Sequence, residues 1–153
     1  MIMKKNEDFQ NRIQMPIVCS GHMPGYANAH AAGLDLRVKT ETPVEFSSGS
    51  HATVHTGVCV EIPEGYFGLI AIRSGLGMKG LVLSNGIGVI DSDYRGEIRI
   101  PLFYHGKETL RLEDGERVAQ MIIIPYVQAD LIVTDALNAT ERGESGFGSS
   151  GRF

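Results

Sequence analysis

Residues 34–38 of the stretch GLDLRV (Gly33–Val38) alternate strictly between apolar and charged side chains. Successive side chains of a β-strand point to opposite faces of the sheet, so this period of two predicts a strand with one buried face. We expect the three apolar side chains of this stretch to face a core, and Asp35 and Arg37 to face solvent.

Similar strand-like patterns recur along the chain, with turn-forming residues between them, and Gly supplies 19 of the 153 residues. Strands spaced about 8–12 residues apart are typical of β-sandwiches and barrels. One helical turn or two could form at Ser74–Lys79, whereas the apolar centre of Tyr126–Arg142 favours a strand. The sequence therefore predicts an all-β domain with at most one short helix. The further candidate strands are Val58–Ile62, Tyr66–Ile72, Glu97–Tyr104, Thr109–Leu112, Val118–Ile124 and Leu131–Val133.

The composition excludes several classes of protein. A net charge of −4 argues against a nucleic-acid partner, although a local arginine cluster could still hold a small anion. Cys19 and Cys59 form no CxxC pair and are too few for a disulfide framework, which favours reduced thiols in the cytoplasm. No apolar run approaches the ~18 residues of a membrane span, and the N-terminus lacks the apolar region of a signal peptide.

The C-terminal stretch RGESGFGSSGR (Arg142–Arg152) differs in kind from the rest of the chain. Rich in Gly and Ser, it predicts a flexible arm over residues 142–153 following a β domain over residues 1–141. Gly-rich tails are most often plain linkers. Here, however, glycine backbone and Arg142 could approach phosphate oxygens, and Phe147 could stack on a base, so the composition suits an arm that closes over a nucleotide.

A cluster of polar residues, Asp91-Ser92-Asp93-Tyr94-Arg95, follows the apolar residues Val89 and Ile90. Partial desolvation at a strand end would make Asp91 a candidate general base. The alternative is that both aspartates simply form a turn and that Tyr94 is a half-buried strand aromatic.

Two further stretches could contact an anion. Arg73 ends a candidate strand where Ser74 and Gly75 open a turn, so their donors could converge on a phosphate. Gln120 lies in an apolar strand, where its amide needs hydrogen-bond partners. Either stretch is equally compatible with an ordinary structural role. His51 and His55 would share a strand face, but no further ligand completes a zinc site.

Taken in order, these pieces resemble the five motifs of the trimeric dUTPase family. The matching stretches are AAGLDLR (Ala31–Arg37), RSGLGMKG (Arg73–Gly80), GVIDSDYRGEI (Gly88–Ile98), GERVAQMI (Gly115–Ile122) and RGESGFGSSG (Arg142–Gly151). The resemblance implies a distorted jelly-roll β-barrel or sandwich and a homotrimer with active sites between subunits. It also implies hydrolysis of dUTP to dUMP and pyrophosphate with Mg²⁺, which limits uracil incorporation into DNA and supplies dUMP.

The same resemblance implies a role for each site residue. Asp91 matches the general base, and Tyr94 matches the ring that lies under the deoxyribose and excludes a 2′-hydroxyl. The implied uracil contacts are Asn85, Gly88, Val89, Ile90 and Arg99, with Phe147 stacking on the base. The implied phosphate contacts are Arg73, Ser74, Gly75, Gln120, Arg142, Gly148 and Ser149, and Asp35 would meet Mg²⁺ through water.

Three positions depart from the family pattern without removing a catalytic group: Ile72 where Pro is frequent, Ser145 where Gly is common, and Ser150 for the usual Thr. Two alternatives stay open. A dCTP deaminase has a related fold, but it needs a different acid–base set. A regulatory nucleotide-binding protein on the same scaffold is the other.

Overall fold

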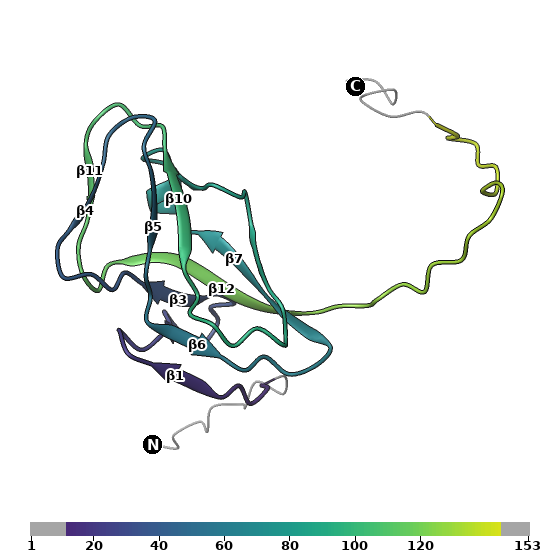
Figure 1. Cartoon of the computed structure of the whole chain (residues 1–153), viewed down its shortest axis with the longest axis horizontal. Helices are drawn as coiled ribbons and strands as arrows, with labels where there is room; N and C mark the ends of the chain where they lie inside the picture. Colours follow the sequence, from purple (N-terminus) through teal and green to yellow (C-terminus); the bar gives the residue numbers. More distant parts are fainter. Residues whose placement is uncertain (1–11, 145–153) are drawn as a thin grey trace, which may run out of the picture.

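The structure is a computed structural model that describes residues 12–144. It is an all-β fold with one short helix, as the sequence predicted (Figure 1). The elements are β1 (Ile17–Cys19), β2 (Gly25–Tyr26), β3 (Leu34–Arg37), β4 (Val44–Phe46), β5 (His51–Val54), β6 (Val58–Val60), β7 (Tyr66–Ile72), α1 (Ser74–Gly77), β8 (Leu81–Leu83), β9 (Gly88–Ile90), β10 (Ile100–Tyr104), β11 (Leu110–Leu112) and β12 (Arg117–Pro125).

Four small antiparallel sheets wrap around one core. The largest has the strand order β2-β3-β12-β7-β9, and β10 joins β5 to β8 in a second sheet. The other two sheets have two strands each, β1 with β6 and β4 with β11. Because neighbours in space come from distant parts of the chain, the polar ends of several strands meet at common edges.

The apolar positions of the alternating strands supply the core. Leu36, Val38 and Met121 are fully buried, and so are Ile100 and Leu102 of β10. Five of the additional candidate strands are confirmed as β6, β7, β10, β11 and β12, with ends that shift by up to three residues. Strand β10 starts late because residues 97–99 bond elsewhere: the N–H of Ile98 donates to the carbonyl of Val58 at 2.8 Å.

Two expectations were wrong. Asp35 does not face solvent: it is only 3% exposed, because two arginines from other strands reach its carboxylate. Leu131–Val133 is not a strand. These three side chains are 91%, 84% and 98% exposed, since no strand of the described chain pairs with them.

From Tyr126 to Glu144 every residue is exposed, and this C-terminal segment leaves the body as an extended path (Figure 1). No helix within residues 12–144 has the length and apolar character needed to cross a bilayer.

Candidate active site

A pocket of about 470 Å³ opens where β9 ends. Five residues that the sequence analysis selected line it together: Val89, Ile90, Asp91, Tyr94 and Arg99. The remaining lining includes His55 and Glu97, which the sequence analysis had not assigned to the site. The structure thus gathers three predicted base contacts and the predicted sugar contact, Tyr94, around the candidate general base, whereas Asn85 and Gly88 do not line this pocket.

Strand β9 is the outer strand of its sheet, paired on one side with β7. No other strand of residues 12–144 covers its second edge, so backbone N–H and C=O groups of Gly88–Ile90 can pair with something else. Asn85 is exposed in the turn that enters this strand, where the N–H of Ile87 donates to its carbonyl at 2.9 Å. An open strand edge can read the hydrogen-bonding edge of a nucleobase as it would read a neighbouring strand.

Asp91 follows β9 directly and begins a tight turn, closed by the N–H of Tyr94 donating to the Asp91 carbonyl at 3.2 Å. Its side chain is exposed. The desolvation expected at this strand end is therefore not provided by residues 12–144 of the same chain.

Tyr94 folds back over the turn that follows. Its hydroxyl donates to the carbonyl of Glu97 at 3.0 Å, while the side chain stays 40% exposed on the pocket side. A Cβ on residue 96 would collide with the Tyr94 hydroxyl, so this ring position requires Gly96. Tyr94 is thus a fixed, accessible aromatic face rather than a buried strand aromatic.

Asp35 forms the centre of a second cluster, on strands β3, β7 and β12. Arg73 Nη1 donates to its Oδ1 at 2.5 Å, and Arg117 Nη1 donates to its Oδ2 at 3.2 Å. Gln120 lies opposite Asp35 in the β3–β12 ladder and opposite Ala71 in the β12–β7 ladder. The paired guanidinium groups place positive charge at this end of the sheet and satisfy both carboxylate oxygens of Asp35.

Helix α1 starts immediately after Arg73, with Ser74 and Gly75 both exposed. The first N–H groups of any helix lack intrahelical acceptors, so they are available to an anion. A Cβ added to Gly75 would meet no atom within 4 Å, which leaves open space in front of this turn.

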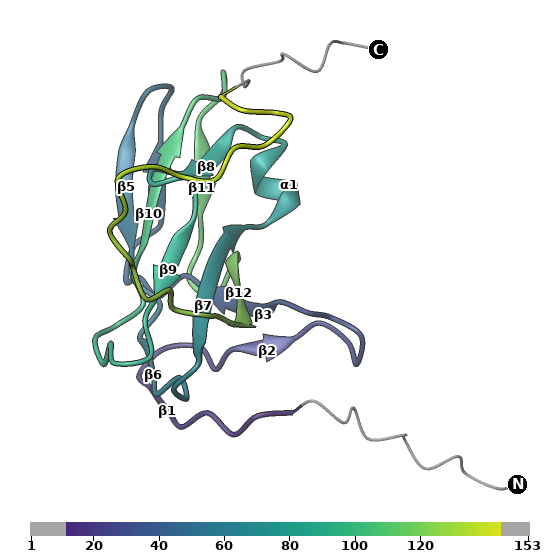
Figure 2. The same cartoon turned by 90° about the vertical axis from the view of Figure 1, so that its right-hand side faces the viewer.

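The two clusters lie at opposite ends of one strand pair (Figure 2). Strands β7 and β9 are antiparallel with Gly68 opposite Ile90, so Asp91 lies level with Phe67. Arg73 follows six residues after Phe67, which places the two backbones roughly 20 Å apart. Within one copy, the candidate base and the candidate phosphate donors are therefore widely separated along β7.

Sequence reasoning missed Arg117 and Glu97, although both fell within quoted motifs. Glu97 accepts hydrogen bonds from His55 Nδ1 at 2.7 Å, from the N–H of Gly57 at 2.7 Å and from the N–H of Thr56 at 3.2 Å. Burial raises the pKa of Glu97, but the hydrogen bonds from His55 and the two backbone N–H groups outweigh it, so its pKa is lowered. In the sequence, the signal for Glu97 is its position directly after Tyr94-Arg95-Gly96 in a quoted motif, with no role assigned to it.

Of the expected arm residues, Arg142 lies in the exposed C-terminal segment. Phe147, Gly148 and Ser149 lie outside the described residues, as do Ser145 and Ser150. Within residues 12–144, no three His, Cys, Asp or Glu side chains form a group that could hold a metal ion.

The Asp35 cluster predicts a measurable loss of stability. Asp35→Ala leaves two guanidinium groups without their anion and should lower the free energy of unfolding by about 2–3 kcal/mol, less than for a fully buried pair because Arg73 and Arg117 retain solvent contact. Urea unfolding at fixed protein concentration would measure this. Glu45→Ala, which removes an exposed 3.8 Å pair with Arg111, should cost under about 1 kcal/mol. Equal losses of unfolding free energy in Asp35→Ala and Glu45→Ala would contradict the stabilising role assigned to the Asp35 cluster.

Comparison with known proteins identifies the family of this fold and site. Residues 20–151 match the dUTPase family. The chain is 44% identical over 132 residues to the deoxyuridine 5′-triphosphate nucleotidohydrolases of Salmonella typhimurium and Salmonella typhi, covering 85% of this chain and 87% of each relative. Its fold is similar to that of the Staphylococcus bacteriophage 80alpha dUTPase solved with dUPNHPP (TM-score 0.81, 29% identity, 90% of this chain and 98% of that one). The all-β body is therefore a dUTPase-type jelly roll, and the chain belongs to the dUTPase family.

Proposed function

We propose that this protein hydrolyses dUTP to dUMP and pyrophosphate, with Asp91 as general base. The observation that carries the proposal is the convergence of Val89, Ile90, Asp91 and Tyr94 on one pocket. Asp91 takes a proton from a water molecule, whose oxygen bonds to the α-phosphorus. The bond from that phosphorus to the bridging oxygen of the β-phosphate breaks, and pyrophosphate leaves. Positioning and charge neutralisation supply most of the acceleration in such reactions.

Uracil selection follows from the open edge of β9. Uracil presents an acceptor at O4 and a donor at N3, and cytosine reverses both. The backbone of Gly88, Val89 and Ile90 can match the first pattern and oppose the second, with Asn85 in the adjoining turn and Arg99 in the same pocket. A close floor against ring carbon 5 would exclude thymine by its methyl group.

Phosphate binding is assigned to the other end of the β7–β9 pair. Ser74 and Gly75 present backbone donors in open space, and Arg73 brings a charge already oriented by Asp35. Gln120 would donate its amide, and Arg142 would approach the γ-phosphate. Phe147 on the base and Gly148 with Ser149 on the phosphates complete the assignment.

Mg²⁺ belongs to the proposal as a charge-neutralising ion on the triphosphate, held chiefly by phosphate oxygens and water. Direct coordination by Asp35 does not fit, because both of its oxygens accept from arginine and its side chain is 5% exposed. Each carboxylate oxygen retains a second lone pair, so a contact through one water stays compatible with the geometry.

We further propose a homotrimer whose active sites lie between subunits. The roughly 20 Å between the two clusters supports this, since a second copy can bring its phosphate-binding end to the Asp91 pocket. So does the exposure of Leu131, Ile132 and Val133, which are unusual on the surface of an isolated chain. The free thiols of Cys19 and Cys59 support a cytoplasmic location, and the net charge of −4 supports the absence of a nucleic-acid partner.

Pyrophosphate release measured with dUTP, UTP, dCTP and dTTP, each with and without Mg²⁺, tests the proposal. We expect rapid pyrophosphate release in the presence of Mg²⁺ from dUTP and from none of the other three nucleotides. Without Mg²⁺, we expect little release even from dUTP. Ammonia release from dCTP would favour the deaminase alternative. Tight nucleotide binding without any turnover would favour a purely regulatory protein.

Tyr94→Ala should erode sugar selectivity. Removing the ring opens space for a 2′-hydroxyl, so the ratio of kcat/KM for dUTP over UTP should fall at least about tenfold. Steady-state kinetics on both nucleotides would measure the ratio. Tyr26→Ala is the matched control, because Tyr26 is exposed on β2 at the opposite edge of the same sheet. If Tyr94→Ala kept the wild-type ratio, another group would have to exclude the ribose.

A further inference from the structure

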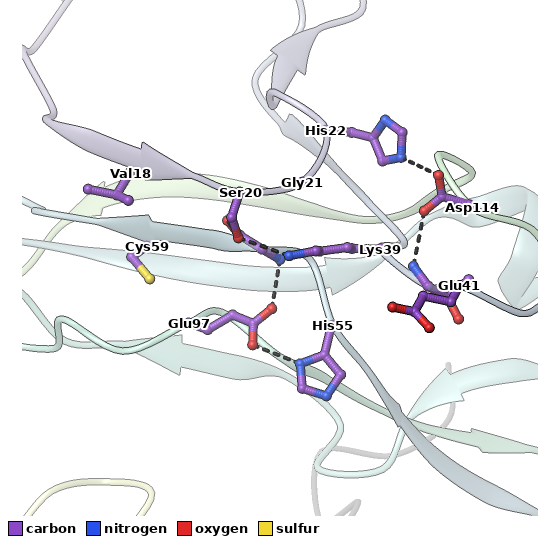
Figure 3. A pocket seen from close by; sticks show the side chains of 12 residues that line it. Val18, Ser20, Gly21, His22, Lys39, Glu41, His55, Cys59, Glu97 and Asp114 are labelled. Atoms are coloured by element: carbon purple, nitrogen blue, oxygen red, sulfur yellow. Dashed lines mark hydrogen bonds and ion pairs between the residues drawn. The ribbon is translucent and has the colours of Figure 1, made fainter.

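Glu97 is the least explained charged residue at the pocket. Glu97 and His55 line both the Asp91 pocket and a second cavity of about 790 Å³, which Figure 3 shows. The Glu97 side chain is 27% exposed, yet its carboxylate accepts three hydrogen bonds from residues 55–57. So many donors on one carboxylate hold it in a single position.

The turn that grips Glu97 is itself anchored. Gly57 has a φ of 68°, and a Cβ there would lie 2.6 Å from the backbone nitrogen of Gly21. The N–H of Ser20 donates to the Gly57 carbonyl at 2.8 Å, and the N–H of Lys39 donates to the His55 carbonyl at 2.8 Å. Backbone contacts with Ser20, Gly21 and Lys39 therefore hold residues 55–57 in place independently of Glu97.

On the opposite side, Glu97 is the anchor of Tyr94. The Tyr94 hydroxyl donates to the backbone carbonyl of Glu97 at 3.0 Å. The backbone beyond is fixed as well, since Thr56 Oγ1 donates to the Ile98 carbonyl at 2.6 Å. A rigid chain of contacts thus runs from the 55–57 turn through Glu97 to the hydroxyl of the pocket aromatic.

We propose that Glu97, clamped by His55 and the 55–57 turn, is a positioning residue that fixes the Tyr94 ring and so sets the preference for a 2′-deoxy sugar. The inference rests on the proposed function, because it concerns the sugar end of the same site. Glu97 makes no contact with the reacting phosphorus in this role; it acts through the placement of Tyr94.

The test compares kcat/KM for dUTP and UTP in four variants. Glu97→Ala keeps the backbone carbonyl that accepts from Tyr94 but loses the three hydrogen bonds that hold residue 97 in place, and should lower the dUTP/UTP ratio about tenfold. Glu97→Gln retains an oxygen that can accept from the Gly57 N–H, and should stay within about threefold of the wild-type ratio. His55→Ala removes one of the three donors and should fall between the two. The control is Glu45→Ala, a distant exposed glutamate, which should leave the ratio unchanged.

A double variant separates positioning from general destabilisation. In a Tyr94→Ala background, Glu97→Ala should change the ratio no further, because its target is already gone. If Glu97→Ala lowered kcat/KM for dUTP and for UTP by the same factor, the inference would be overturned. It would also be overturned if Glu97→Ala changed the dUTP/UTP ratio equally in the wild-type and Tyr94→Ala backgrounds. If Glu97→Ala does not fold, an unchanged ratio in His55→Ala would overturn it. Failure of the wild-type protein to hydrolyse dUTP would instead reject the proposed function, and this inference with it.

Discussion

Asp91→Asn is expected to lower kcat for dUTP by at least about 10²-fold while nucleotide affinity changes little. Asn has nearly the shape of Asp but cannot take a proton from water. Asp91 is exposed, so the substitution should not disturb folding. Single-turnover pyrophosphate release, together with binding of a non-hydrolysable dUTP analogue, would separate the chemical step from binding.

The matched control is Asp93→Asn, two residues away in the same exposed turn. We assign Asp93 no role beyond that turn, and its variant should hydrolyse dUTP at close to the wild-type rate. Undiminished turnover in Asp91→Asn would remove Asp91 as the base. A loss of similar size in both variants would mean that the turn needs negative charge of any origin.

Truncation after Ala139 should leave a folded body and lower kcat/KM for dUTP by at least about tenfold, because a closing arm excludes water and adds phosphate contacts. Residues 126–144 are all exposed, and none of them belongs to the buried core. Thermal unfolding should therefore change little while activity falls.

A second truncation, after Glu144, sharpens this comparison. It keeps Arg142 and removes only the last nine residues, which include Phe147. Equal impairment of the two truncated chains would assign the effect to the last nine residues. A smaller loss after Glu144 would assign part of it to Arg142, and full activity of both would show that the arm takes no part in catalysis.

The pattern of apolar residues predicted those strands whose own sequence favours an extended conformation. The predicted strand Tyr66–Ile72 has the same ends as β7, because its short length, its aromatic and β-branched residues and the turn residues before it favour a strand over a helix. The short strands β1, β4 and β8 were not predicted, and each pairs with a strand distant in sequence. Leu131–Val133 has strand-forming residues but no partner within its own described chain, and a strand needs one.

The site shows the same division. Asp91 and Tyr94 were identified by their order within a motif, and the pocket brings them together. The environment of Asp35 could not be read from alternation, because its arginine partners lie 38 and 82 residues away in sequence. Glu97 likewise meets residues some forty positions earlier, and only the folded chain reveals that contact.

The antiparallel pairing of β7 and β9 has a consequence for how such an enzyme responds to dilution. If the active sites form between subunits as proposed, the two ends of this strand pair serve different sites, so a lone copy would be folded and yet unable to turn over dUTP. Turnover per copy would then fall as the protein is diluted below the dissociation constant of its subunits, with no unfolding at all, and substrate spanning two copies would favour their reassembly.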